Sequence, residues 1–294
     1  MSIRVLSPPS PTTAGVSLQT VELSAGESTA TVNLLGATLV SWTHRGTELL
    51  FVSKKAVYDN KKAIRGGIPV VFPQFGAWDN GRPQHGFARS TAFAYKDKDS
   101  VAQRGSDGND SAMAVFELSD SEATRAMWNH PFRLVYTVTL TPKSLEQHLV
   151  VHNTGTEEFS FTTLLHTYFR TDSLKTVTVA GLTDRDFKDK VDNMATKHED
   201  RDVVTVSELT DRIYMKTLDE HLILNLAGGK GVQLVKENMP DTVVWNPAEE
   251  GGKAIADLGG EEVNHFICVE AGAVVEPVTV AANSSKSFRQ TLKL

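Results

Sequence analysis

Two arginines frame the part of the sequence that is richest in chemically useful side chains, RGGIPVVFPQFGAWDNGRPQHGFAR. Arg65 begins this stretch and Arg89 ends it, and Gln84 and His85 come shortly before the second arginine. A guanidinium stays charged, is rarely buried alone, and can bind a phosphate or carboxylate through two parallel hydrogen bonds. The apolar run between the arginines therefore suggests an anion-binding pocket. Surface salt bridges beside an ordinary core strand are the alternative for an isolated arginine pair.

A histidine stands on the second face of a predicted strand, EEFSFTTLLHTYF. Side chains alternate between the two faces of a strand, so Phe159 and Phe161 share one face and His166 points the other way. The phenylalanine face must contact the core. His166 therefore lies among hydroxyl-bearing neighbours, on a face that either lines a cleft or hydrogen-bonds to an adjacent strand.

A glutamate occupies a comparable position in HFICVEAG, where Phe266, Cys268 and Glu270 share one face. A carboxylate near the end of a core-like strand is costly unless it is paired, and burial raises its pKa toward the range of a general base. The alternative is a glutamate at the strand end that faces solvent. One imidazole and one carboxylate, without a G-x-S-x-G nucleophile motif, favour proton transfer over covalent catalysis. A glycosidase would need a second carboxylate.

Short strands must position these residues, because segments rich in Val, Thr, Phe and Leu alternate with Gly, Asn, Asp and Pro. This pattern predicts an all-β protein with a large antiparallel β-sandwich and a few short helices. The predicted strands are 16–22, 29–43, 48–53, 86–95, 112–119, 132–141, 145–152, 158–169, 176–181, 203–208, 221–226, 231–237, 242–245, 263–271 and 277–293. Helices are predicted at 121–128 and 249–258, and mobile loops at 8–14, 103–111 and 184–202.

The composition of the chain excludes several classes of partner and of covalent cross-link. The 294 residues carry a net charge of −6 without a basic cluster, so we expect neither a nucleic-acid nor a membrane partner. Cys268 is the single cysteine, which excludes an internal disulfide. No metal site is expected. His148 and His152 are four residues apart, a spacing that suits metal binding on a helix, but in a strand they stand about 13 Å apart.

The chain is expected to form one domain, 1–294, with residues 1–15 as a flexible tail. No apolar run is long enough to span a bilayer and the N-terminal region lacks a signal-peptide core, so a cytoplasmic location is expected. The final residues, Leu292-Lys293-Leu294, leave organellar import by a non-standard C-terminal signal open.

Six motifs, taken together, resemble the aldose 1-epimerase (mutarotase) superfamily, and within it the hexose-6-phosphate branch, the glucose-6-phosphate 1-epimerases. The motifs are RGGIPVVFPQFG, PQHGFAR, FTTLLHTYF, ELTDRIY, VVWNP and FICVEAG. They follow the family order and, with the flanking strands, cover about residues 30 to 290. The resemblance implies a galactose mutarotase-like supersandwich, in agreement with the strand pattern.

Carried over by position, the resemblance makes His166 the general acid and Glu270 the general base in opening and reclosing a sugar ring. The substrate-binding residues that it implies are Arg65, Gln84, His85, Arg89 and Asp211. Of these, Arg89 marks the phosphate branch, because Arg65 has counterparts in enzymes of unphosphorylated hexoses. The implied reaction converts one anomer of a hexose 6-phosphate, chiefly D-glucose 6-phosphate, into the other, and it requires no cofactor.

Two alternatives stay open at this point. A mutarotase of unphosphorylated aldoses would use the same acid and base, and a non-catalytic sugar-phosphate-binding module would use the same pocket in regulation. The chain also departs from the branch at Ala248, where an aromatic residue is common, and in the segment before the glutamate strand. These departures leave the sugar preference open. The protein is expected to act as a monomer on a small-molecule substrate.

Overall fold

The computed structural model of the chain describes residues 1–6, 19–59, 61–79, 81–105 and 110–294. Within these ranges the chain folds almost entirely into strands, and the ladders between named strands are antiparallel. The predicted all-β antiparallel sandwich is therefore confirmed. No helix in these ranges has the length and apolar character needed to cross a membrane.

The strands form three sheets. The five-stranded sheet contains β1 (Ser2–Leu6), β2 (Thr20–Ala25), β3 (Ser28–Asn33), β4 (Thr38–His44) and β5 (Thr47–Glu48). The ten-stranded sheet contains, in spatial order, β17 (Val203–Val204), β14 (Thr178–Ala180), β19 (Glu220–Leu224), β20 (Val232–Glu237), β23 (Ser285–Lys293), β11 (Ser144–Asn153), β10 (Phe132–Leu140), β9 (Ser111–Ser119) and β7 (Ala94–Tyr95), with β8 (Val101–Gln103) also paired to β9.

The eight-stranded sheet contains β16 (Ala195–Glu199), β15 (Arg185–Asp189), β18 (Thr210–Tyr214), β21 (Asp241–Asn246), β22 (Phe266–Val280), β12 (Phe159–Leu165) and β6 (Val70–Val71), with β13 (Tyr168–Arg170) paired to β22. The helices are α1 (Glu122–Met127) and α2 (Ala248–Lys253), and the 3-10 turns are η1 (Ala88–Ser90), η2 (Asp97–Asp99), η3 (Leu174–Thr176), η4 (Ala227–Gly229) and η5 (Glu262–His265).

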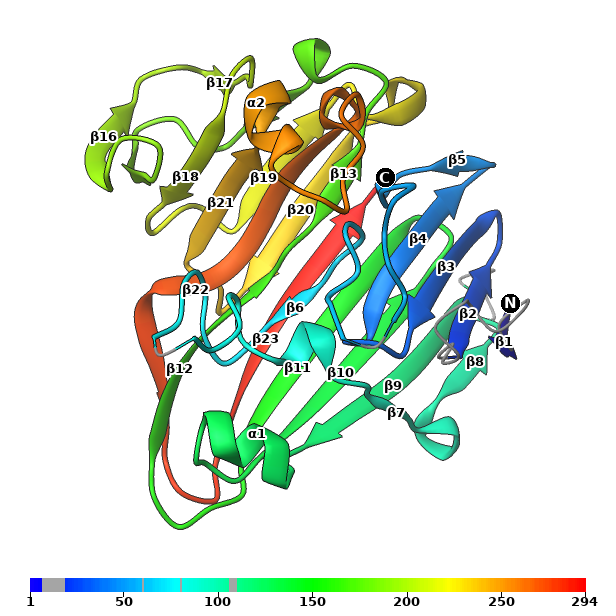
Figure 1. The fold of residues 1–294 in the computed structure, drawn as a ribbon. Coiled ribbons are helices and arrows are strands. Elements are labelled where there is room, and N and C mark those ends of the chain that lie inside the picture. Colours follow the sequence, from blue (N-terminus) through cyan, green and yellow to red (C-terminus); the bar gives the residue numbers. More distant parts are fainter. Residues whose placement is uncertain (7–18, 60, 80, 106–109) are drawn as a thin grey trace.

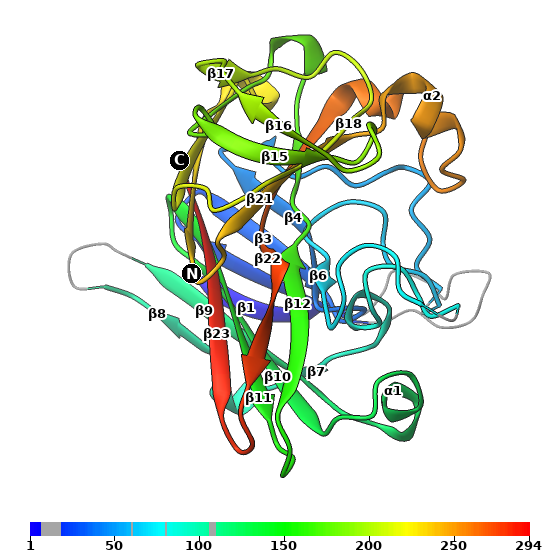
Figure 2. The ribbon, with the colours of Figure 1, turned by 90° about the vertical axis from the view of Figure 1, so that its left-hand side faces the viewer.

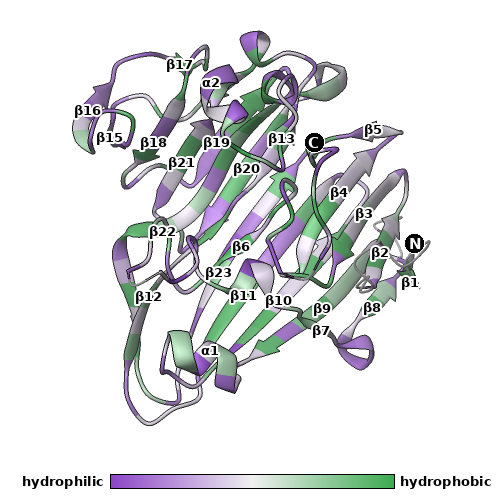
Figure 3. Cartoon of the chain, viewed as in Figure 1, coloured by the Kyte–Doolittle hydropathy of each residue, from purple (hydrophilic) through white to green (hydrophobic). Residues whose placement is uncertain are grey.

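The five- and eight-stranded sheets together make one layer of the sandwich, opposite the ten-stranded sheet (Figures 1 and 2). Isolated bridges join them, from Leu39 to Ile68 and from Leu50 to Phe169. One large cluster of buried apolar side chains fills the space between the two layers. Figure 3 shows hydrophobic and hydrophilic residues alternating along β9, β10 and β11, as expected for strands with one face on this core.

The strand β22 is buried on both faces for its first eight residues. Ile267 and Val269 belong to the main core, whereas Phe266 and Cys268 pack on the other face beside Tyr168. This confirms the two faces predicted for the segment. The second face is covered because loops from the arginine-framed stretch and from the region after α2 lie over it.

The neighbouring strand is interrupted beside Glu270. β12 ends at Leu165 and β13 begins at Tyr168, and between them the His166 amide donates to the carbonyl of Pro69 at 3.0 Å. The backbone therefore leaves the regular ladder at the residue whose side chain was predicted to do chemistry. Strand interruptions of this kind re-aim a side chain.

The arginine-framed stretch is not an ordinary core strand, because only Val70–Val71 forms a strand within it. Two glycines fix its path. Gly67 and Gly86 have φ of +70° and +71°, and a Cβ at either position would lie 2.1 Å from a carbonyl oxygen, that of Leu39 or of Phe72. Only glycine allows such a close backbone approach at a left-handed φ. Both ends of the stretch are thereby anchored to neighbouring segments.

The prediction of a mobile loop at 184–202 is wrong, because β15 and β16 form a hairpin there. Ion pairs cross the hairpin, from Lys197 to Asp189 at 2.8 Å and from His198 to Asp186 at 2.7 Å. Opposite charges on paired strands stabilise a ladder. The high charge of this segment therefore comes from cross-strand pairs in a hairpin.

Other boundaries also differ from the prediction. Segments 29–43 and 277–293 each form two strands, 86–95 is mostly a turn with η1, and the strand at 210–214 was missed. Residues 2–6 of the expected tail form β1, while 7–15, like the predicted loop at 8–14, fall outside the described ranges, as do 106–109 of the loop at 103–111. The helix at 121–128 is confirmed, with the Ser121 hydroxyl capping Thr124. The second helix ends earlier than predicted, at Lys253.

We expect Gly86→Ala to lower the free energy of unfolding by roughly 2–5 kcal/mol, because a left-handed residue costs about 1–2 and displacing the Phe72 carbonyl about 1–3 kcal/mol. Gly81→Ala is the matched control, since Gly81 has the same φ of +71° and nothing within 4 Å of a built Cβ. The control should lose only about 1–2 kcal/mol. Urea unfolding followed by tryptophan fluorescence measures both, and equal losses would contradict the close-approach argument.

Candidate functional site

A cavity of about 220 Å³ lies on the face of the eight-stranded sheet that is turned away from the main core. It brings together all seven residues predicted from the sequence: Arg65, Gln84, His85, Arg89, His166, Asp211 and Glu270. The other residues that line it are Phe75, Lys190, Val243, Trp245 and Ile255. Most of the residues that line this small cavity therefore have ionisable side chains.

The imidazole of His166 is held among other rings. It stacks on Tyr168 with centroids 4.7 Å apart and an interplanar angle of 13°, and it meets the rings of His85 and Trp245 nearly at right angles, each 5.8 Å away. His166 is buried, with 8% of its surface exposed. The flanking rings restrict the orientations that the imidazole can adopt.

The carboxylate of Glu270 faces this imidazole, with its Oε1 atom 3.4 Å from Nδ1 of His166. Glu270 is 1% exposed, and within the described residues neither of its oxygens nor Nδ1 of His166 has a hydrogen-bond partner. Such groups are rare in folded proteins and typical of functional sites. The two side chains are thus close enough to exchange a proton but are left open to other partners.

Burial acts on both groups of this pair in opposite directions. It raises the pKa of Glu270 well above its usual value, with Asp211 adding to the effect, and it lowers the pKa of His166 well below its usual value, with the charges of Arg89 and Arg65 adding to that effect. Both shifts favour uncharged side chains. Burial therefore disfavours both the carboxylate and the imidazolium, and neither charge is stabilised by a hydrogen bond from the described residues.

His85 is a neutral hydrogen-bond donor toward the cavity. The Gly76 amide donates to its Nδ1 at 3.1 Å, so the ring proton is on Nε2. Burial, followed by the charges of Arg89, Lys190 and Arg65, lowers the pKa of His85 to about 3. Its backbone adopts a left-handed φ of 64°, an unusual conformation for histidine.

The two arginines differ in how many of their donors are occupied. Arg65 pairs with Asp257 at 3.0 Å and donates to the hydroxyl of Tyr168 at 3.3 Å. Arg89 donates to the main-chain carbonyl of Gln84 at 2.7 Å and forms no ion pair with any carboxylate of the described residues. Burial lowers the pKa of Arg89 to about 10, so it stays charged at neutral pH. The cavity therefore contains a cation whose counter-ion is not supplied by the described side chains.

Asp211 lies at another part of the wall and is paired with a residue that the sequence did not reveal. The Lys190 ammonium is 2.7 Å from its carboxylate and 5.5 Å above the ring of Phe75. Burial raises the pKa of Asp211, and Lys190 opposes this shift. Asp211 can accept hydrogen bonds from hydroxyl groups in the cavity, and Lys190 can donate them.

Other contributors were also missed from the sequence. Trp245 belongs to the VVWNP motif, and Tyr168 follows His166 by two residues on the same face, so a period-two argument could have found Tyr168. No sequence pattern around Lys190 or Asp257 indicated that either residue belongs to the site. Lys190 follows the hairpin strand β15, and Asp257 reaches Arg65 across 192 residues of sequence.

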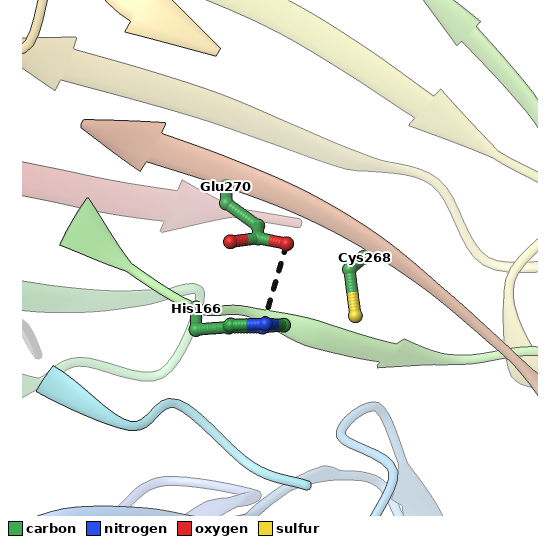
Figure 4. A group of neighbouring side chains, drawn as sticks. All are labelled: His166, Cys268 and Glu270. Carbon is green, nitrogen blue, oxygen red and sulfur yellow. Dashed lines mark ion pairs between the residues drawn. The ribbon is translucent and has the colours of Figure 1, made fainter. Parts of the chain in front are cut away.

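One group of donors in this site could hold a metal ion, although no metal site was expected. His166, Cys268 and Glu270 each offer one ligand atom, and these atoms lie within 4.8 Å of one another (Figure 4). The set combines nitrogen, sulfur and oxygen donors, a mixture that zinc accepts.

We expect His85 to remain neutral, with its proton on Nε2, from pH 8 down to pH 5, because its pKa of about 3 lies below this range. Two-bond ¹H–¹⁵N correlation spectra of the ring nitrogens measure both the charge and the tautomer. His198, an exposed histidine whose pKa is raised by Asp186, provides the contrast within one sample. A His85 ring that titrates near pH 6.5 would contradict the burial argument.

Similarity to known proteins identifies the family of this chain. Residues 19–293 match the sequence profile of the family described as aldose 1-epimerase. Two relatives provisionally named glucose-6-phosphate 1-epimerase are similar along most of their length. The protein from Cenchrus ciliaris is 34% identical over 85% of this chain and 77% of its own, and that from Escherichia coli K12 is 32% identical over 90% and 86%.

Solved structures point the same way. A protein from Salmonella typhimurium provisionally described as a mutarotase, YeaD, superposes with a TM-score of 0.86 at 29% identity, covering 99% of this chain and 96% of its own. A galactose 1-epimerase from Lactobacillus acidophilus shares the fold alone, with a TM-score of 0.68 at 14% identity over 99% and 98% of the two chains. The chain therefore belongs to the aldose 1-epimerase family of isomerases.

Proposed function

We propose that this protein interconverts the α and β anomers of hexose 6-phosphates, chiefly D-glucose 6-phosphate. The observation that carries the proposal is a single cavity that combines a buried, unsatisfied imidazole–carboxylate pair with a charged arginine lacking a carboxylate partner among the described residues. The pair supplies proton transfer at the sugar ring, and Arg89 supplies a counter-charge for the phosphate. The names of the relatives support the same substrate.

The reaction needs one proton removed and one proton added. Glu270 takes the proton of the hydroxyl on C1 while His166 gives a proton to the ring oxygen, and the bond between C1 and that oxygen breaks. The resulting aldehyde rotates about the C1–C2 bond. Closure on the other face, with both proton transfers reversed, gives the other anomer. Nothing is oxidised and no group leaves, so the reaction as written requires no cofactor.

The scheme requires the buried pair to hold one proton between its two side chains. Transfer of the shared proton from Glu270 to His166 across 3.4 Å creates the carboxylate base and the imidazolium acid together. No proton from solvent is needed for this step. A fixed, water-poor setting of this kind makes acid–base assistance worth about 10²–10⁴-fold.

The remaining wall residues fit the polar groups of the substrate. Arg89, with Arg65 beside it, clamps the 6-phosphate, while the Nε2 proton of His85 and the Asp211 carboxylate hydrogen-bond to sugar hydroxyls. Arg65 and Arg89 also line a neighbouring cavity of about 250 Å³ that Lys61 and Lys62 border. Positive charge therefore accumulates on the side where a phosphate would enter, which favours its capture.

The same proposal includes a cytoplasmic protein that acts as a monomer, without nucleic-acid or membrane partners. The expectation of no nucleic-acid or membrane partner rests on the sequence: its acidic balance and its lack of basic clusters.

Arg89→Ala should raise the KM for glucose 6-phosphate by roughly 10- to 100-fold, because a hydrogen bond to a charged group contributes about 1.5–3 kcal/mol. Turnover of free glucose should change little. Arg45→Ala, which removes one charge from an arginine that is 65% exposed and paired with Glu27, is the matched control. Equal losses on both sugars would refute the phosphate role of Arg89 and favour a mutarotase of unphosphorylated aldoses.

The pH dependence follows from the shared proton. A second proton on the pair must enter against the lowered pKa of His166, so the acid limb of kcat/KM should lie below pH 6.5. Loss of the last proton is governed by the raised pKa of Glu270 and sets the alkaline limb. The profile should be measured after correction for the phosphate of the substrate, whose second pKa is about 6. An acid limb centred above pH 6.5 would contradict the buried pair.

A further inference from the structure

A thiol lies beside the imidazole–carboxylate pair and has no part in the chemistry proposed above. Cys268 precedes Glu270 by two residues on β22, so both side chains are on the same face. Figure 4 shows the sulfur and the carboxylate on the same side of β22, both near the imidazole of His166. One donor atom from each residue lies within 4.8 Å of the other two.

The donors around this thiol are unsatisfied. Nδ1 of His166 and both oxygens of Glu270 are buried without a hydrogen-bond partner among the described residues. Cys268 itself is fully buried, so all three side chains are withdrawn from bulk water. The donors themselves give up little hydration when a cation binds, so the main cost is dehydration of the ion, which the bonds to these donors must offset.

The distances between the donor atoms fit a metal ion with tetrahedral coordination. Zinc bonds to nitrogen and oxygen are about 2.0–2.2 Å, which places two such ligands about 3.4 Å apart at a tetrahedral angle. Nδ1 of His166 and Oε1 of Glu270 are 3.4 Å apart without any movement. With a zinc–sulfur bond of about 2.3 Å, the sulfur must come within about 3.6 Å of each, so donor atoms that lie up to 4.8 Å apart must approach one another by about 1 Å.

We propose that His166, Cys268 and Glu270 form a site for Zn²⁺, and that occupation of this site inhibits the enzyme. Binding of the ion rests on the geometry of the three donors. Inhibition rests in addition on the proposed function, because zinc occupies the acid and the base that the isomerisation uses.

The charge balance of the site limits how tightly zinc binds. A thiolate and a carboxylate together neutralise a divalent ion, but Arg65, Arg89 and Lys190 in the same cavity repel it. The fourth position of the tetrahedron is available to water, as in zinc sites with three protein ligands, whereas a bound sugar needs the same His166 and Glu270 side chains. Zinc and the sugar phosphate should therefore compete.

The single cysteine of the chain makes the binding test specific. Co²⁺ replaces Zn²⁺ in such sites and gives a thiolate-to-metal charge-transfer band, which in this protein can arise only from Cys268. Titration of the full chain with Co²⁺ should produce this band, and Zn²⁺ should displace it. Glucose 6-phosphate should lower the apparent metal affinity.

Cys268→Ala should lose the band and keep anomer exchange. Its half-inhibitory Zn²⁺ concentration should rise by at least about 100-fold, since even residues outside the ligand shell contribute about 10- to 100-fold to metal affinity. His198→Ala is the control for a surface site, because His198 lies within 4 Å of the carboxylates of Asp184, Asp186 and Asp200. This variant should remain as sensitive to zinc as the unaltered chain.

The two readouts separate the two proposals. A charge-transfer band without anomer exchange would uphold the metal site and refute the proposed function. Exchange without a band, or zinc inhibition that Cys268→Ala leaves unchanged, would overturn the metal site and leave the function standing. If Cys268→Ala fails to fold, the Co²⁺ titration of the unaltered chain decides the question alone, because absence of the band refutes the site.

Discussion

The structure depends on one energetic constraint, the burial of His166 against Glu270 without a hydrogen bond between them. A buried polar group that lacks a partner costs about 1–3 kcal/mol, and a charged one costs more. Because burial shifts both groups toward their uncharged forms, the larger cost of burying a charge is reduced. The rest must be offset by the packing around them. A substrate that satisfies both groups is thereby favoured over water.

The packing that offsets this cost comes from β22. Its first eight residues are buried on both faces, so Glu270 is held on a strand fixed by the main core and by the ring cluster of Phe51, Tyr168 and Phe266. The break between β12 and β13 then turns His166 toward it. Gly67 and Gly86 allow the stretch that contributes both arginines to pack closely against neighbouring backbone carbonyls. The proposed acid, base and counter-charge are thus held by segments far apart in the sequence.

The sequence predicted the face that lines the cavity, because that prediction needed only local alternation. His166 and Glu270 stand opposite core residues with a period of two, and the motifs supplied Arg65, Gln84, His85, Arg89 and Asp211. The break at His166 could not be predicted, because the carbonyl of Pro69 that receives its amide is almost a hundred residues away. Lys190 was missed because the hairpin that positions it is stabilised by ion pairs, and hydropathy patterns do not report those.

The central claim is that the Glu270–His166 pair catalyses anomer exchange. The most direct measurement is saturation-transfer NMR of the C1 proton of glucose 6-phosphate, comparing the unaltered protein with Glu270→Gln. We expect accelerated exchange that the variant loses by about 10²–10⁴-fold, while the variant still binds the sugar phosphate. Absence of acceleration by the unaltered protein, or full acceleration by Glu270→Gln, would contradict it.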